Sequence, residues 1–271
     1  MVTQDKRMRR TLILLLALCA AVPGHAKDKD KDKPAPPQAA SPAEVIDEPV
    51  QYRHCISLAR QKPTDGWEEA LAWSSMGGGE PARHCAAIAL IGLGQFEEAA
   101  NRLETLAGQS RANAKTRAGM LDQAGQSWLL AERPERANAA LTTALQLMPD
   151  APDLLVDRAQ SLAAAKNYRE ALTDLDRALS VAPDRADALT FRAAAKRFLD
   201  DQAGAAADAA KALAVDPLYQ DAWLEDGIIK RLRGDDNAAR KSWLKVLELA
   251  PASTAADSAR HNIEVLDVKD H

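Results

Sequence analysis

Four prolines recur at one fixed interval, and this spacing constrains the fold more than any other feature. Pro149, Pro183, Pro217 and Pro251 are each 34 residues apart. Proline ends a helix because it has no amide hydrogen to donate and its ring clashes with the preceding turn. Each interval therefore holds one structural unit, and a unit repeated in series is typical of a solenoid in which neighbours stack.

Both halves of the unit 152–185 have the apolar spacing of a helix. The second half carries its apolar face at Ala171, Leu172, Leu175, Ala178 and Leu179. The first half carries a similar face at Leu155, Ala159 and Leu162. Lys166 and Asn167 separate the halves. We therefore expect two short antiparallel helices, neither of which can bury its apolar face alone.

Small and bulky residues recur in the same phase as the prolines. One set of equivalent positions, in the first helix expected for each unit, is small: Gly125, Ala159, Ala193 and Gly227. A second set, in the second expected helix, is mostly bulkier: Leu141, Leu175, Ala209 and Trp243. Alanine occupies all members of a third set: Ala137, Ala171, Ala205 and Ala239. The pattern predicts close helix approach at the small sites and filling of the space between helices by the larger ones.

This pattern of prolines, small residues and large residues resembles the tetratricopeptide repeat family over residues 118–254. The resemblance implies an all-α fold, a right-handed α-solenoid of stacked antiparallel helix hairpins. Some positions depart from the family pattern. Lys166 and Asp200 stand where the family favours a glycine in the turn, and the aromatic residue of the second helix survives only as Trp243.

The repeat pattern also divides the chain into segments. We expect a degenerate first unit at 48–79, a second unit with a longer connection at 80–117, four regular units at 118–253, and a capping helix with a tail at 254–271. Counting 34 residues from Glu80 gives Ala114, four residues before the next unit begins. The break predicts a longer connection or an extended helix around 108–116.

Residues 1–26 have the pattern of a cleaved secretory signal. Basic residues open the segment, an apolar run follows that is too short to span a bilayer, and small residues precede Lys27. This interpretation places the protein in the periplasm or outside the cell, in a bacterial cell envelope. Two alternatives stay open: an uncleaved anchor, or a lipoprotein attached through Cys19.

Residues 27–47 are predicted to be a disordered linker because they alternate in charge and are then rich in proline and alanine. The segment would serve as a plain tail or as a tether. The chain has a net charge of −4 and residues 1–26 contribute +3, so the remainder carries −7. No basic stripe interleaved with aromatic residues is present, and no other apolar run is long enough for a membrane span. We therefore expect neither nucleic acid as a partner nor a span in the mature chain.

Cys55 and Cys85 form an even pair in the first helices of successive units. Such helices are neighbours in a stack, so an oxidising compartment would allow a disulfide. Two alternatives stay open. The cysteines could be reduced core residues, or they could form a metal site with the histidines that precede them, His54 and His84.

Catalysis has little support in the sequence. No nucleophile-elbow, zinc-protease or phosphate-loop motif is present. We therefore predict that the protein is not an enzyme and that it has no cofactor and no metal site.

Recognition of another protein is the function that the resemblance implies. In the family, the fifth, ninth and twelfth residues of each unit line the concave face. These are Asp122, Gln126, Leu129, Val156, Gln160, Ala163, Thr190, Ala194, Arg197, Leu224, Ile228 and Arg231. The carboxylate clamp of some relatives is not reproduced, because Asp122 and Val156 stand where donors would be expected.

We predict that five of these residues contact an extended or helical segment of a partner: Thr190, Arg197, Leu224, Ile228 and Arg231. The alternative is that they are ordinary groove lining. The predicted function is an exported, non-enzymatic scaffold. Its alternatives are a redox- or metal-linked module that uses the two His-Cys pairs, and a membrane-tethered subunit of a cell-envelope assembly complex.

Overall fold

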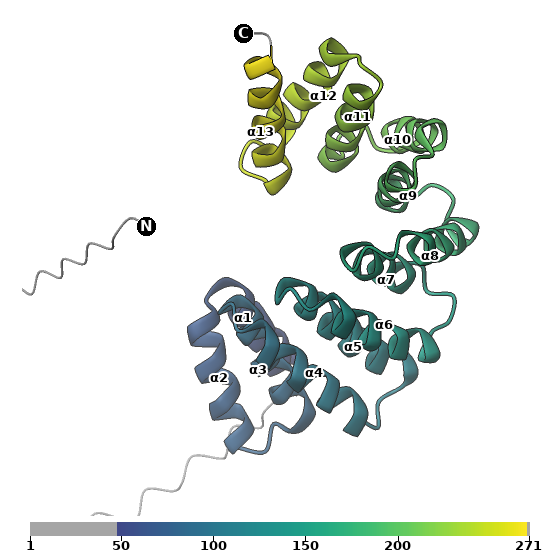
Figure 1. The fold of residues 1–271 in the computed structure, drawn as a ribbon. Coiled ribbons are helices and arrows are strands. Elements are labelled where there is room, and N and C mark those ends of the chain that lie inside the picture. Colours follow the sequence, from purple (N-terminus) through teal and green to yellow (C-terminus); the bar gives the residue numbers. More distant parts are fainter. Residues whose placement is uncertain (1–47, 270–271) are drawn as a thin grey trace, which may run out of the picture. The chain divides into compact units, whose positions relative to one another are not determined.

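A computed structural model describes residues 48–269, and every regular element in this range is an α-helix. The predicted segments 1–26 and 27–47 lie outside the described residues. The thirteen described helices follow one another in space in chain order (Figure 1). They are α1 (Glu48–Gln61), α2 (Pro63–Ser75), α3 (Gly79–Gly92), α4 (Phe96–Gln109), α5 (Ala114–Leu130), α6 (Pro134–Leu147), α7 (Pro152–Ala164), α8 (Tyr168–Val181), α9 (Ala186–Phe198), α10 (Gln202–Val215), α11 (Gln220–Leu232), α12 (Asp236–Leu249) and α13 (Thr254–Lys269). The prediction of an all-α repeat solenoid is confirmed.

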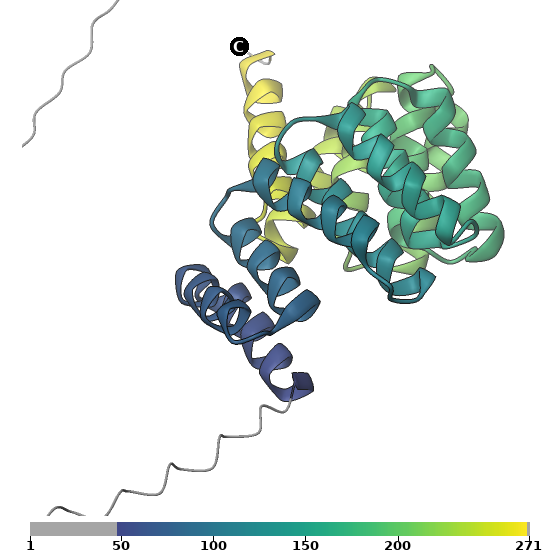
Figure 2. The ribbon, with the colours of Figure 1, turned by 90° about the horizontal axis from the view of Figure 1, so that it is seen from below.

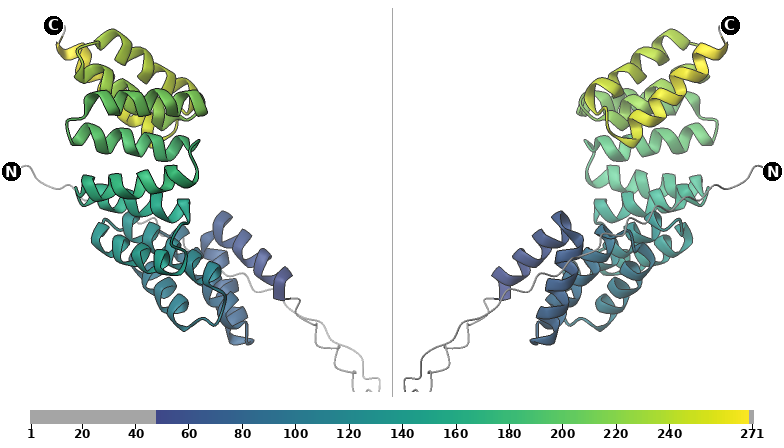
Figure 3. Two further views of the ribbon diagram at one scale, coloured as in Figure 1. Left: turned by 90° about the vertical axis from the view of Figure 1, so that its right-hand side faces the viewer. Right: turned by 90° about the vertical axis from the view of Figure 1, so that its left-hand side faces the viewer.

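The helices form two layers. Each odd-numbered helix packs on the odd-numbered helix of the next unit, from α1 on α3 to α11 on α13. The exception is the pair α3 and α5, because α4 contacts both and connects them. Even-numbered helices pack mainly on odd-numbered ones. We call the odd-numbered helices the inner layer and the even-numbered helices the outer layer. Figures 2 and 3 show the same succession of helix pairs from other sides.

Two small positions of the repeat, Gly125 and Gly227, lie where paired helices approach closely. A Cβ atom added to Gly125 would lie 2.6 Å from the Leu141 side chain, and one added to Gly227 would overlap with the Trp243 indole. Carbon atoms in a close-packed interior do not approach one another this closely. The small and bulky positions inferred from the repeat period therefore face each other across these two hairpins.

In five of the hairpins, the turn between the two helices contains one residue in the left-handed conformation at an equivalent position. The five equivalent positions have φ between 60° and 82°: Gly94 at 73°, Glu132 at 60°, Lys166 at 64°, Asp200 at 63° and Gly234 at 82°. Glycine adopts this conformation without a steric penalty, whereas other L-residues do so at a cost. The turn geometry is thus fixed by the stack even at the three positions that lack glycine.

The break in the repeat period lengthens one helix of the inner layer. α5 has 17 residues, whereas α7, α9 and α11 have 13 each. Its extra residues are at the start, where the Asn113 side chain accepts a hydrogen bond of 2.9 Å from the amide of Thr116. Residues 114–117 therefore belong to the first helix of the third unit, and not to the second unit as predicted.

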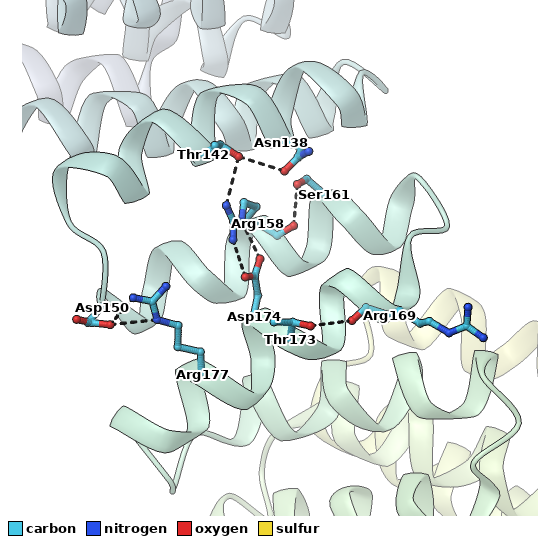
Figure 4. A network of polar contacts seen from close by, with 9 residues as sticks. All are labelled: Asn138, Thr142, Asp150, Arg158, Ser161, Arg169, Thr173, Asp174 and Arg177. Atoms are coloured by element: carbon cyan, nitrogen blue, oxygen red, sulfur yellow. Dashed lines mark hydrogen bonds and ion pairs between the residues drawn. The ribbon is translucent and has the colours of Figure 1, made fainter.

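A buried ion pair joins the two helices of the unit 152–185. The guanidinium of Arg158 in α7 donates to both carboxylate oxygens of Asp174 in α8, at 2.7 and 2.6 Å. Figure 4 shows this pair beneath Thr142 of α6, whose hydroxyl lies 3.4 Å from Arg158. The contact connects three helices of two units.

The same pair recurs one repeat later. Arg192 and Asp208 occupy the positions equivalent to Arg158 and Asp174, and their bidentate contact measures 2.8 and 2.6 Å. Lys196 adds a second cation 2.7 Å from Asp208. Burial opposes ionisation of Asp208, but its hydrogen bonds to Arg192 and Lys196 outweigh burial and lower its pKa. These pairs were not predicted from the sequence, although their common offset by one repeat period is visible there.

Helix α13 covers the apolar end of the last regular unit. Ala256, Ala259 and Leu266 are buried against Trp243 and Val246 of α12. Terminal repeats need one side that faces water, so we interpret α13 as a cap. Within residues 48–269, no helix has the length and apolar character that crossing a bilayer requires.

Candidate binding face on the inner layer

Thr190 and Arg197, two of the residues predicted to contact a partner, are already engaged inside the protein. Thr190 is only 5% exposed, and its hydroxyl donates to the carbonyl oxygen of Ala186 at 2.7 Å. Arg197 pairs with Glu225 of α11 at 2.6 and 3.1 Å. Both side chains are held by bonds inside the protein, and their contact with a partner stays a prediction.

The other three predicted residues lie at the C-terminal end of the inner layer. Leu224 and Ile228 are partly buried and pack with the cluster that α13 covers. Arg231 is half-buried and forms no ion pair with any residue in the range 48–269. The structure thus leaves Arg231 as the accessible polar member of the predicted set, flanked by the partly exposed edges of two apolar side chains.

A cavity opens on the inner layer at the opposite end of the stack. It has a volume of about 360 Å³ and lies between α1, α3, the end of α4 and the start of α5. Its lining residues are Tyr52, Glu80, Pro81, His84, Leu106, Thr116, Gly119, Met120 and Gln123. Thr116 belongs to the added turn of α5, so the break in the repeat period contributes directly to this cavity.

A hydrogen-bonded chain of three side chains forms one wall of the cavity. The Tyr52 hydroxyl lies 2.7 Å from Nδ1 of His84, and Nε2 of His84 lies 2.7 Å from Oε1 of Gln123. Burial lowers the pKa of His84 and keeps the ring neutral, although the Gln123 bond acts in the opposite direction. A neutral ring donates through one nitrogen and accepts through the other. Tyr52 therefore donates to Nδ1, and Nε2–H donates to Gln123, which fixes the relative positions of α1, α3 and α5.

A disulfide between Cys55 and Cys85 joins α1 and α3, the same two helices that carry Tyr52 and His84. The two Cα atoms are 6.1 Å apart, and both residues are fully buried. His54 is exposed, whereas both ring nitrogens of His84 are used by Tyr52 and Gln123. The two His-Cys pairs are therefore not gathered around a common point, and the geometry gives the redox- or metal-linked alternative no support. Among the residues 48–269, no group of three potential metal ligands is clustered.

Next to the cavity, the inner layer carries two neighbouring carboxylates. Asp122 of α5 and Asp157 of α7 are bridged by the amide of Gln126, at 3.3 and 3.0 Å. Oδ1 of Asp122 is buried and accepts no hydrogen bond from the described residues. Burial, together with the interaction with Asp157, raises the pKa of Asp122 to about 8. Neither aspartate has a cationic partner within 48–269, and the raised pKa leaves Asp122 largely protonated near neutral pH.

The fold defines a class, the α-helical repeat proteins built of stacked helix hairpins. A family model, described as tetratricopeptide repeat, matches residues 129–195. This match lies within the regular units, so these units are tetratricopeptide repeats. No curated protein matches the chain by sequence.

Solved structures share the fold at low sequence identity. A tetratricopeptide repeat protein from Parabacteroides merdae matches with a TM-score of 0.63 and 16% identity, over 82% of this chain and 85% of its own. A thermophilic protein of the same type from Thermus thermophilus matches with a TM-score of 0.57 and 18% identity, over 69% of this chain and 98% of its own. A chain of the APC/C hetero-tetramer Cut9–Hcn1 matches with a TM-score of 0.59 and 14% identity, over 80% of this chain and 46% of its own. These likenesses concern the fold alone.

Proposed function

We propose that this protein is an exported, non-enzymatic scaffold that binds a segment of another protein along its inner layer. The fold supports a role in protein association, because stacked hairpins present one extended surface. The cavity between α1, α3 and α5 is the observation that carries the proposal. It combines apolar lining with several polar groups in fixed positions, as binding sites commonly do.

A structural neighbour gives this proposal additional support. Cut9–Hcn1 is a hetero-tetramer, so the same fold takes part in a complex with a second protein there. In this chain the polar groups of the inner layer hold one another, since Tyr52 donates to His84 and His84 donates to Gln123. Their arrangement therefore favours binding over catalysis.

Export is supported by the basic and apolar pattern of residues 1–26 and by the pairing of Cys55 with Cys85, because disulfides persist in oxidising compartments. Cell fractionation tests this part of the proposal. The mature protein should be found in the periplasm or medium with a new N-terminus at Lys27. Recovery in the detergent phase instead would favour attachment through Cys19.

Site-specific photo-crosslinking in the native cell tests the binding face. A photoreactive residue at Gln126 or at Arg231, both in the inner layer, should yield a discrete adduct with another protein. The control positions on the outer layer are Glu170 of α8 and Lys241 of α12, both exposed helix residues. Equal adducts from both layers, or none from the inner layer, would contradict the proposal.

A further inference from the structure

We propose that the cavity between α1, α3 and α5 receives a lysine or arginine side chain of the partner segment. This inference rests on the proposed function, since it names the chemistry of the ligand that the inner layer binds. The occupant is thus a basic peptide segment, which enters with one cationic side chain at the first units of the stack.

The floor of the cavity suits the stem of such a side chain. Pro81, Leu106 and Met120 present apolar surface to the space of about 360 Å³. Lysine and arginine bury their methylene groups along apolar surface and keep the charged end at a polar rim. A short or acidic side chain would leave this apolar surface uncovered.

The charge at the cavity is negative. Glu80 is the one lining residue that carries a full charge, because His84 is neutral. The Ser110 hydroxyl donates to Oε2 of Glu80 at 2.6 Å and holds the carboxylate in place. No lysine or arginine among residues 48–269 pairs with Glu80. A ligand cation would supply the missing charge-assisted bond, which is stronger than a bond between neutral groups.

Two aspartates lie on the surface beside the cavity. Asp122 comes directly before the cavity residue Gln123, and its Oδ1 atom lacks a hydrogen-bond donor among the described residues. Asp157 lies next to it on α7. A further basic residue of the segment would meet the Asp157 carboxylate after the segment leaves the cavity, whereas Asp122 keeps its proton up to about pH 8. The charge pattern therefore favours a basic segment over an acidic or a purely apolar one.

The rigidity of the wall makes the cavity a preformed site. The chain Tyr52–His84–Gln123 connects the three helices, and the disulfide Cys55–Cys85 holds α1 against α3. A preformed site avoids the entropy cost of ordering its walls when a ligand binds. Recognition of a single long side chain is therefore feasible with the small number of contacts that this cavity offers.

Methionine methyl NMR provides a direct test, because Met120 lines the cavity whereas Met76 and Met148 do not. The probe is a blocked alanine peptide with one central lysine or arginine, compared with the same peptide carrying norleucine or glutamate. We expect the lysine and arginine peptides to shift the Met120 methyl signal in a saturable manner and to leave Met76 and Met148 unchanged. Added salt should weaken this binding.

The variant Glu80→Gln keeps the shape of the side chain and its ability to accept the Ser110 bond. We expect it to weaken binding of the lysine peptide roughly tenfold, as loss of one hydrogen bond to a charged group predicts. The matched control is Glu170→Gln, which makes the same charge change at an exposed position of α8. It should leave the affinity for the lysine peptide unaltered.

Three results would overturn the inference. The Met120 signal could stay fixed up to saturating lysine peptide, or norleucine could bind as tightly as lysine. Alternatively, replacement of Lys27, Lys29, Lys31 and Lys33 by serine could shift the Met120 signal of the free protein, which would identify the chain's own linker as the occupant. If photo-crosslinks from Gln126 or Arg231 persist in any of these cases, the proposed function stands and this inference alone fails.

Discussion

Arg158 and Asp174 form a bidentate ion pair between α7 and α8, and the carboxylate end is almost completely buried. Arg192 and Asp208 repeat this relationship in the following unit. At the next repeat the two positions are Asp226 and Ser242, which hydrogen-bond to each other at 2.5 Å. One repeat earlier they are Ala124 and Ala140, both buried. The same pair of sites thus changes from apolar to ionic to hydrogen-bonded along the stack.

Removal of one partner from the first ion pair should be strongly destabilising. Asp174→Ala leaves Arg158 without its partner, and we expect a loss of about 3 kcal/mol in the free energy of unfolding. The double variant Arg158→Met, Asp174→Leu should recover most of this loss, because apolar residues of similar volume can replace a buried pair. Urea denaturation measures both, with exposed Asp184→Ala as the control. Equal effects of Asp174→Ala and Asp184→Ala would contradict the prediction.

The turn residues offer a stabilising change. Lys166 has φ of 64°, a conformation that costs an L-residue about 1 kcal/mol. Lys166→Gly should therefore raise the free energy of unfolding by up to about 1 kcal/mol, whereas Lys166→Ala, which keeps the Cβ atom, should not. Gly234→Ala should lower it by a similar amount. Thermal unfolding of the three variants measures these changes in stability. A lower stability of Lys166→Gly would show that the turn is not strained.

The close approach of Gly227 to Trp243 predicts a steric effect. The added Cβ of Gly227→Ala would overlap with the indole. We expect a loss of about 1–3 kcal/mol from overpacking. Gly108→Ala in α4, where a Cβ meets nothing within 4 Å, is the control and should be neutral or stabilising. If Trp243→Leu does not reduce the penalty at Gly227, the clash is not its cause.

Reduction of the disulfide should weaken the first units most. Cys55 and Cys85 close a loop with a sequence separation of 30, for which the chain-entropy relation gives about 3.5 kcal/mol. We expect the variant Cys55→Ala, Cys85→Ala to lose up to this amount, with hydrogen exchange increased in α1 and α2 and little changed in α11 to α13. Thiol titration of the mature, denatured protein checks the bond itself, since two free thiols would show that it does not form.

Asp122 makes the stability dependent on pH in the neutral range. Burial and the contact with Asp157 raise the pKa of Asp122 from 3.8 to about 8 in the folded protein. The folded state then binds this proton more tightly than the unfolded chain does, so stability declines as the pH rises from about 4 to about 8. Asp122→Asn should flatten this decline. Denaturation midpoints measured across this pH range test it, and an equal slope in both proteins would contradict the assignment.

Much of the architecture was predictable from the sequence. The prolines and the small and bulky positions recur with one period, and the structure places hairpin ends and helix contacts at these positions. The prediction succeeded because each repeat makes mostly local contacts with its neighbours, so that short-range patterns encode the fold. The four-residue break before Ala118 was also visible, although the pattern left open whether a loop or a helix absorbs it.

The binding face could not be predicted in the same way. Thr190 and Arg197 occupy the positions that the repeat assigns to the concave surface, yet one is buried and the other is neutralised by Glu225. The cavity depends on where α5 begins and on how Tyr52, His84 and Gln123 meet across three helices. The repeat period determines which residues face inward. Whether an inward residue is free depends on the side chains that neighbouring helices bring beside it, and only the tertiary structure decides that.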